Sequence, residues 1–298
     1  MGASPLLADA LVRIQREVDA TFDRLLPVPA DARSRLVEAM RYAAIGGGKR
    51  LRPLLLTATA GLFGVERDSA VRCGVALEAV HVYSLIHDDL PCMDDDATRH
   101  GKPTTHLAFD EATAVLAGDA LQGFAYEVLS DPASIGDPFT RAELVSVLAG
   151  ASGAHGMVGG QMMDIVAEGG GFDLPMVTRL QQLKTGALLA AAVEMGAVMG
   201  RIAPEARAHL RHYARDIGLA FQIADDLLDH EGDEELAGKA LRKDAVAGKQ
   251  TFVSLQGPER ARERARLLVD QAVGHLGQYG AEADLLRDIA RYIVDRKH

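Results

Sequence analysis

The chain has 298 residues, 48% of them hydrophobic and 25% charged, a composition typical of a folded globular protein and not of a disordered one. With 32 Lys and Arg against 42 Asp and Glu, the net charge of −10 argues against a general nucleic-acid-binding protein. Two cysteines, Cys73 and Cys92, cannot build a disulfide scaffold, and no Cys-x-x-Cys pair indicates a zinc or redox site. Metal sites with oxygen or imidazole ligands remain open.

Neither the N-terminus nor any apolar run predicts association with a membrane. Residues Met1 to Leu6 lack the basic and then apolar pattern of a signal peptide. The longest apolar candidate, residues 187–200, contains Glu194 and glycines and falls short of the ~20 residues that span a bilayer. We therefore expect no membrane span and a cytoplasmic location.

The hydrophobic pattern is helical along almost the whole chain. Apolar residues recur at steps of three and four over residues 11–25, 36–43 and 210–221, which predicts amphipathic helices. The apolar stretch 75–86 predicts a buried helix that ends in carboxylates. Glycine- and proline-rich turns separate helix-sized segments, strand signals are weak, and no linker divides the chain. The sequence predicts an all-α fold with residues 1–298 in a single domain.

Two acidic clusters lie 137 residues apart, at 88–96 and at 225–229. In the second, Asp225 and Asp229 are i,i+4 neighbours on one helix face, and crowded like charges destabilise a helix unless a cation binds there. Ligands that are all oxygen favour Mg²⁺, and the spacing is not that of an EF-hand. The alternative is that both runs are solvated helix ends.

Basic residues form a complementary set. Residues 46–53 place three cations after a glycine turn, where backbone N–H groups can approach an anion, although the spacing is not that of a Walker loop. Singly, such cations can serve only solubility. Together with Mg²⁺-binding carboxylates, dispersed Lys and Arg predict a site for diphosphate groups.

From about Arg41 to Gln250 the chain resembles the trans-polyprenyl diphosphate synthase family, and within it the bacterial farnesyl diphosphate synthases. The motifs that carry this resemblance are residues 47–53, 88–94, 160–164, 184–186 and 221–229, in family-like order and spacing. The resemblance implies an isoprenoid-synthase-type helical bundle around a central cavity, and a homodimer. It also implies a Mg²⁺-dependent trans-prenyltransferase with isopentenyl and allylic diphosphates as partners.

The resemblance assigns roles to individual residues. Three Mg²⁺ ions would be held or supported by the carboxylates Asp88, Asp89, Asp94, Asp164, Asp225 and Asp229. Isopentenyl diphosphate would contact Gly48, Lys49, Arg52, His81 and His100. The allylic diphosphate would contact Arg99, Lys184, Lys239 and Lys249, and Gln161 and Phe221 would complete the substrate-binding set. The catalytic residues would be Lys184, Thr185 and Gln222.

The implied reaction is ionisation, condensation and elimination, in which dimethylallyl or geranyl diphosphate yields (2E,6E)-farnesyl diphosphate. In the family that the chain resembles, large side chains just upstream of the first Asp form the floor of the product pocket. Tyr83 and Ser84 lie five and four residues before Asp88, and five residues of helix span ~7.5 Å. The resemblance therefore implies that Tyr83 closes this pocket and favours a fifteen-carbon product; the alternative is an ordinary core tyrosine. His81 and Asp88 lie on nearly one helix face, so we expect both to face the same cavity.

The chain departs from the family pattern at His100, where the family usually has a second arginine. Histidine, with a pKa near 6.5, would bind the isopentenyl diphosphate less firmly above neutral pH. A geranylgeranyl diphosphate synthase remains open. A class I terpene cyclase needs a different second metal motif. An inactive regulatory subunit would lack one of the two acidic motifs, whereas this chain contains both.

Overall fold

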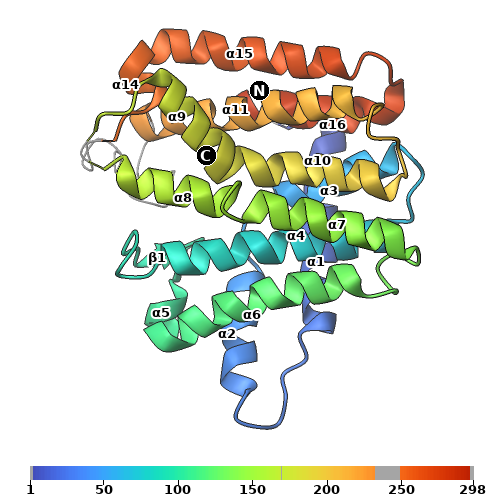
Figure 1. The fold of residues 1–298 in the computed structure, drawn as a ribbon, viewed down its shortest axis with the longest axis vertical. Coiled ribbons are helices and arrows are strands. Elements are labelled where there is room, and N and C mark those ends of the chain that lie inside the picture. The colour runs from blue at the N-terminus through green and yellow to red at the C-terminus, as the bar shows by residue number, and fades with distance from the viewer. Residues whose placement is uncertain (1–2, 169, 232–248, 296–298) are drawn as a thin grey trace.

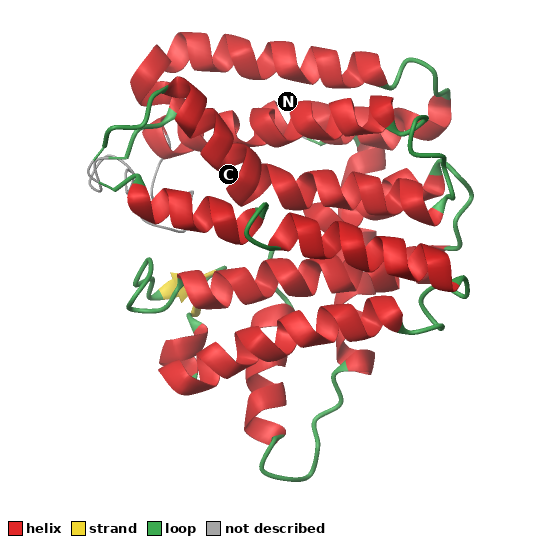
Figure 2. Ribbon diagram, viewed as in Figure 1, coloured by secondary structure: helices red, strands yellow, loops and turns green. Residues whose placement is uncertain are grey.

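The computed structural model describes residues 3–168, 170–231 and 249–295, in which helices pack side by side into one bundle (Figures 1 and 2). Its helices are α1 (Pro5–Leu25), α2 (Ser34–Ala44), α3 (Leu51–Gly61), α4 (Arg67–Asp88), α5 (Thr105–Ala108), α6 (Glu111–Ser130), α7 (Pro138–Ser152), α8 (Met157–Val166), α9 (Leu174–Gln181), α10 (Ala187–Met199), α11 (Ala208–Glu231), α14 (Phe252–Gln256), α15 (Pro258–His275) and α16 (Asp284–Asp295). A π-helical turn spans Gln182–Gly186, and a 3₁₀ turn spans Ala281–Ala283. The predicted all-α fold is confirmed.

Helix α4 is the central helix of the bundle and packs against α1, α3, α6 and α10. Its residues are buried on every side, as expected for a helix without a polar face. The predicted buried helix over residues 75–86 is thus confirmed, and it ends at Asp88. By length and composition α4 could cross a membrane, but 83% of its apolar window is buried inside the protein, as in a core helix.

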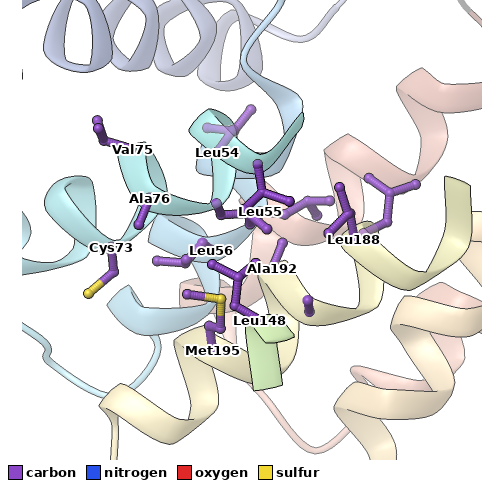
Figure 3. Close-up of a cluster of buried hydrophobic side chains, with 14 of the residues drawn as sticks. Leu54, Leu55, Leu56, Cys73, Val75, Ala76, Leu148, Leu188, Ala192 and Met195 are labelled. Atoms are coloured by element: carbon purple, nitrogen blue, oxygen red, sulfur yellow. The ribbon is translucent and has the colours of Figure 1, made fainter. Parts of the chain in front are cut away.

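The main hydrophobic core joins α3, α4, α7 and α10 through aliphatic side chains of moderate size. Figure 3 shows Leu55 and Leu56 of α3 beside Leu188 and Met195 of α10, all fully buried. Each fully buried leucine of this kind contributes about 1.5–3 kcal/mol through the removal of apolar surface from water. The core therefore fixes the position of α4 against the C-terminal half of the chain.

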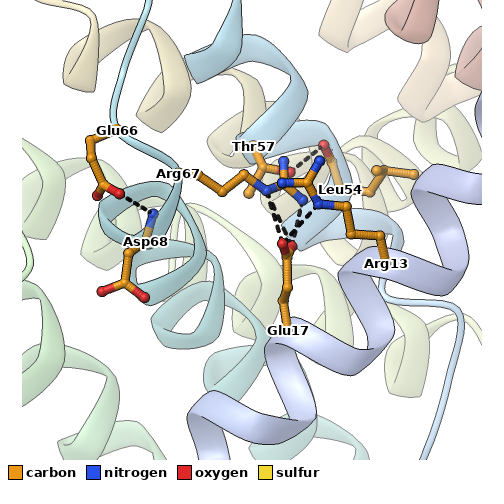
Figure 4. A network of polar contacts seen from close by, with 7 residues as sticks. All are labelled: Arg13, Glu17, Leu54, Thr57, Glu66, Arg67 and Asp68. Atoms are coloured by element: carbon orange, nitrogen blue, oxygen red, sulfur yellow. Dashed lines mark hydrogen bonds and ion pairs between the residues drawn. The ribbon is translucent and has the colours of Figure 1, made fainter.

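Helix α1 is fixed to the start of α4 by a shared carboxylate. Glu17 accepts hydrogen bonds from Arg13 Nε at 2.9 Å and from Arg67 Nη2 at 2.5 Å (Figure 4). Glu66 caps α4 by accepting from the backbone N–H groups of Asp68 and Ser69, which satisfies donors that have no partner within the helix. These contacts set the direction in which α4 runs toward its acidic end.

The two short strands, β1 (Thr98–Arg99) and β2 (Lys102–Pro103), form a hairpin. Both turn residues, His100 and Gly101, have positive φ, at 53° and 75°, as a tight two-residue hairpin requires. The sequence did not predict this hairpin, because a histidine replaces the asparagine or aspartate that usually precedes the glycine. The hairpin lies at the same end of the bundle as α14 and the C-terminal end of α8, on the left in Figure 1.

A buried ion pair lies behind the glycine turn at residues 46–48. Arg50, in left-handed backbone conformation at φ 53°, donates to Glu78 Oε1 at 2.9 Å and to Asp19 Oδ1 at 2.8 Å. The side chains of Arg50 and Glu78 are only 2% and 5% exposed. Breaking a buried pair from one side leaves an uncompensated charge, which costs more than the pair itself contributes.

We therefore predict that Glu78→Ala lowers the free energy of unfolding by about 3 kcal/mol, because Arg50 keeps only Asp19 as a charged partner. Denaturant titration measures the change. Glu259→Ala is the matched control, since that carboxylate pairs with Arg262 at the surface with 88% of its side chain exposed, and no measurable loss is expected. An unchanged unfolding free energy in Glu78→Ala would contradict the prediction.

Candidate active site

A cavity of about 560 Å³ lies between the 46–53 turn, one side of α4, the β1–β2 hairpin and the C-terminal helix α16. Eight of the predicted site residues line it: Gly48, Lys49, Arg52, His81, Asp89, Arg99, His100 and Phe221. Tyr292 of α16 also lines this larger cavity, with Lys49 Nζ 5.9 Å from the centre of its ring. Tyr292 was not predicted, because no sequence motif extends beyond Gln250.

The larger cavity is cationic and partly dehydrated. The Nε atom of Arg52 is buried and makes no hydrogen bond, and burial lowers the pKa of this guanidinium, although Glu78 and Asp225 oppose the shift. Burial, and then the positive charge of Arg52, holds the pKa of His81 well below its usual range. His81 is therefore neutral at pH 7, and Arg52 offers an N–H group that is free to bind an anion.

His100 faces this cavity from the hairpin turn. An added Cβ at Gly47 would lie 3.1 Å from its Cδ2 atom, so the ring packs closely on the glycine turn. Burial is the first cause that lowers the pKa of His100, followed by the charges of Arg99 and Arg50, while Glu78 opposes them. In the absence of an anionic ligand, His100 is therefore mostly uncharged at neutral pH.

Asp89, at the end of α4, also lines the larger cavity and is paired with Arg99. Arg99 Nε donates to Asp89 Oδ1 at 3.0 Å, and its Nη2 atom contacts both Asp89 and Asp96. Burial raises the pKa of Asp89, and the Arg99 charge opposes that rise. This pair holds the hairpin against the end of α4.

A second, smaller cavity of about 80 Å³ lies on the other side of the α4 end. Six predicted site residues line it: Asp88, Asp94, Gln161, Asp164, Lys184 and Lys249. The backbone N–H of Asp94 donates to Asp88 O at 2.8 Å, so the chain after α4 folds back and brings the two carboxylates of the first motif into one cavity. Gln161 Nε2 donates to Asp88 Oδ1 at 2.6 Å. Burial raises the pKa of Asp88 to about 6, and Asp94 adds to the shift.

Asp164 has two lysines as partners in this smaller cavity. It accepts from Lys184 Nζ at 2.6 Å and from Lys249 Nζ at 3.0 Å through the same Oδ2 atom. Although burial raises its pKa, the two lysines hold the pKa of Asp164 below its usual range. Its carboxylate therefore orients two cations.

The second acidic motif is anchored through Asp226, a residue to which the sequence analysis gave no role. Asp226 accepts from the backbone N–H of Phe252 at 2.9 Å and from Gln222 Nε2 at 3.2 Å. Gln222 Oε1 in turn accepts from Thr185 Oγ1 at 3.0 Å. The Thr185 hydroxyl proton is committed to this chain of hydrogen bonds, which leaves the lone pairs of its oxygen directed elsewhere.

Some of the predicted groupings differ from the structure. The expectation that His81 and Asp88 face one cavity differs from the structure, in which His81 lines the larger cavity and Asp88 the smaller. Arg99 lines the larger cavity and Lys184 and Lys249 the smaller, although the charge of Arg99 still acts on Asp88. Lys239 lies outside the described residues.

Tyr83 and Ser84 line neither of these two cavities within the described part of the chain. Tyr83 is buried, its ring lies 5.8 Å from that of His87, and burial raises its pKa to about 12. The Gln122 side chain opposes this rise, and Ser84 Oγ donates to the backbone O of His81 at 2.7 Å. Their role in product length stays a prediction.

The donor set around the smaller cavity suits a hard cation. Across the described ranges, no group of three or more His, Cys, Asp and Glu side chains is arranged to hold a metal ion alone. Asp88 and Asp94 are nonetheless oxygen ligands brought together, and the negative charge of Asp94 adds to the rise that burial causes in the pKa of Asp88. Mg²⁺ binds through one or two carboxylates and completes its shell with water and phosphate oxygens, so the residues present fit it.

Comparisons with known proteins show both the family and the fold of this chain. The polyprenyl synthetase family model matches residues 33–289. The chain is 46% identical over 267 residues to the farnesyl diphosphate synthase of Escherichia coli, an alignment that covers 88% of this chain and 89% of that protein.

Solved structures extend the comparison. A crystal structure from Zymomonas mobilis, described as an FPP/GFPP synthase, is 57% identical, covers 97% of this chain and 98% of that one, and has a TM-score of 0.89. A geranyltransferase from Helicobacter pylori, solved with magnesium and isoprenyl diphosphate, is 31% identical, with coverage of 99% and 98% and a TM-score of 0.83.

The family match and these identities confirm the resemblance inferred from the motifs, and with it the trans-prenyltransferase activity of the farnesyl diphosphate synthase type. The chain belongs to the polyprenyl synthetase family.

Proposed function

We propose that this protein joins isopentenyl diphosphate to dimethylallyl diphosphate and then to geranyl diphosphate, and releases (2E,6E)-farnesyl diphosphate. The observation that carries this proposal is the pair of cation-lined cavities on the two sides of the α4 end. One bimolecular condensation needs two diphosphate sites whose reacting carbons meet, and holding both substrates in place removes much of the entropic barrier.

The larger cavity is the proposed site of isopentenyl diphosphate. Lys49, Arg52 and His100 surround it, and the unpartnered Nε of Arg52 supplies a donor for a phosphate oxygen. Neutral His81 can donate one hydrogen bond without adding to the charge. The uncharged tail of the substrate would then point along α4 toward Phe221.

The smaller cavity is the proposed site of the allylic diphosphate. Lys184 and Lys249, oriented by Asp164, would bind its oxygens, and Lys239 is proposed to join them. Asp88 and Asp94 from one side, and Asp225 and Asp229 from the other, would hold three Mg²⁺ ions. When bound, these ions neutralise the charge that develops on the departing diphosphate.

The remaining polar groups suit a reaction that passes through a carbocation. Thr185 and Gln222 present fixed dipoles whose hydrogen-bond directions are set by Asp226. Such preorganised dipoles stabilise charge without reorganising during the reaction. The departing diphosphate can accept the final proton, so no side-chain base is required.

The assembly and the location follow the predictions from the sequence. We propose a homodimer through the exposed face of α5 and α6, where Leu107, Val115 and Leu116 present apolar side chains to solvent. We also propose that residues 1–298 act as one domain, in the cytoplasm.

Product analysis tests the proposed function. Purified protein with Mg²⁺, labelled isopentenyl diphosphate and dimethylallyl or geranyl diphosphate should yield farnesol after dephosphorylation. Geranylgeraniol as the main alcohol would keep the reaction class but contradict the proposed product. Absence of condensation with both substrates present would reject the proposal in favour of a cyclase or an inactive subunit.

Tyr83→Ala is predicted to shift the products from fifteen carbons to twenty or more, because it removes the bulk that we propose closes the product pocket. Chromatography of the dephosphorylated products measures the shift. Tyr279→Ala is the control, since it removes a ring of the same size that packs on Phe63 at 6.2 Å and lies outside α4. Unchanged chain length in folded Tyr83→Ala would make Tyr83 an ordinary core residue.

At about pH 8.5, His100→Arg is predicted to lower KM for isopentenyl diphosphate about tenfold. This corresponds to about 1.4 kcal/mol of binding free energy, which is within the range of one charge-assisted hydrogen bond. Since burial and neighbouring cations lower the pKa of His100, the wild-type ring gains charge only as the pH falls. The advantage of arginine should therefore shrink at about pH 6.5. Steady-state kinetics at the two pH values measures the KM for isopentenyl diphosphate in both proteins, and an unchanged KM for the allylic diphosphate is the control. Equal KM values for isopentenyl diphosphate in the two proteins at both pH values would refute the prediction.

A further inference from the structure

The π-helical turn Gln182–Gly186 carries Lys184 and Thr185, and it lies between α8 and α11. A π turn is rare and widens the helix locally, so it needs support from its neighbours to persist. Both neighbours approach it at a glycine.

On the α8 side the contact is made at Gly160. A Cβ added there would lie 2.2 Å from Lys184 N, 2.5 Å from Lys184 Cα and 2.8 Å from the carbonyl carbon of Leu183. All three are backbone atoms, so no side-chain rotation can make room. Only glycine allows α8 to approach the π turn this closely.

On the α11 side the contact is made at Gly218. A Cβ there would lie 3.2 Å from Gly186 Cα, which is tighter than ordinary van der Waals contact but less severe than at Gly160. The π turn is thus held from two sides, firmly by α8 and more gently by α11.

Four residues after each glycine lies a side chain that accepts a hydrogen bond from a side chain of the π turn. Asp164, one turn after Gly160, accepts from Lys184 Nζ at 2.6 Å. Gln222, one turn after Gly218, accepts from Thr185 Oγ1 at 3.0 Å. Residues four apart share a helix face, so each helix contributes one close backbone contact and one hydrogen bond to the same turn.

We propose that Gly160 and Gly218 are positioning residues for the prenyl transfer: they set the location of the π turn and thereby place the Lys184 ammonium and the Thr185 hydroxyl at the allylic site. This inference rests on the proposed function for the identity of the ligand. The geometric claim about Lys184 can be measured by ligand binding alone, without reference to the product.

Gly160→Ala has to move the π turn by about 1 Å, so kcat/KM for the allylic diphosphate should fall about 10²-fold. Gly218→Ala needs only a few tenths of an ångström and should cost about threefold, mainly in kcat. KM for isopentenyl diphosphate should change less than about twofold in both, because the larger cavity lies across α4. Gly150→Ala on α7, where an added Cβ meets no atom within 4 Å, is the control and should match the wild type.

A double-mutant cycle separates positioning from general loosening of the fold. The affinity for inorganic pyrophosphate with Mg²⁺ is measured by calorimetry in wild type, Gly160→Ala, Lys184→Ala and the double variant. If Gly160 acts by placing Lys184, Gly160→Ala weakens binding in the wild type but adds little once Lys184 is absent. Additive losses, or wild-type binding and kinetics in folded Gly160→Ala, would overturn the proposal.

Circular dichroism shows whether Gly160→Ala folds. If it does not, a second double-mutant cycle with Gly218→Ala and Thr185→Ala decides. This cycle measures kcat, and the expected result is that the two losses are non-additive. If the losses of pyrophosphate affinity in the Gly160→Ala and Lys184→Ala variants are non-additive but the wild-type protein makes no prenyl product, the proposed function is overturned and the positioning inference stands. The reverse outcome, prenyl transfer with additive losses, would overturn only the inference.

Discussion

A buried helix that ends in two consecutive carboxylates has to be neutralised on two sides at once, and this constraint organises the whole site. Helix α4 is surrounded by the core up to Asp88 and Asp89, whose charges cannot be solvated freely. On one side Arg99 binds Asp89 and brings the hairpin with it. On the other, Asp88 meets Gln161 and the charge of Lys184, and burial still raises its pKa to about 6. The two carboxylates at the end of α4 are thus divided between the two cavities, Asp89 at the larger and Asp88 at the smaller.

The fold followed from the sequence because its signals are local. Three- and four-residue periodicity, a continuous apolar stretch and clear breakers fixed the helices, including buried α4. The hairpin at residues 98–103 escaped prediction, since a His-Gly turn departs from the usual pattern. The π turn at 182–186 escaped for a different reason: only the close approach of two other helices stabilises it, and no local pattern records that.

The sequence predicted many of the residues that line the site, but it did not predict which of them share a cavity. The predicted residues make up most of the lining of the smaller cavity but fewer than half of the lining of the larger one. Residue spacing predicted that His81 and Asp88 face the same cavity, because spacing shows which residues share a helix face. It does not show which other elements pack on each side of that face. Glu78, a carboxylate within an apolar stretch, was a signal that could have revealed the buried pair with Arg50. Tyr292 carried no such signal.

The contact of Lys49 with Tyr292 has a consequence for how the protein is made. These residues are 243 positions apart, yet both line the larger cavity. During synthesis the glycine turn and α4, which ends at Asp88, leave the ribosome long before α16, which begins at Asp284. The larger cavity therefore lacks one wall until α16 has been made, and until then the cationic loop stays open to solvent.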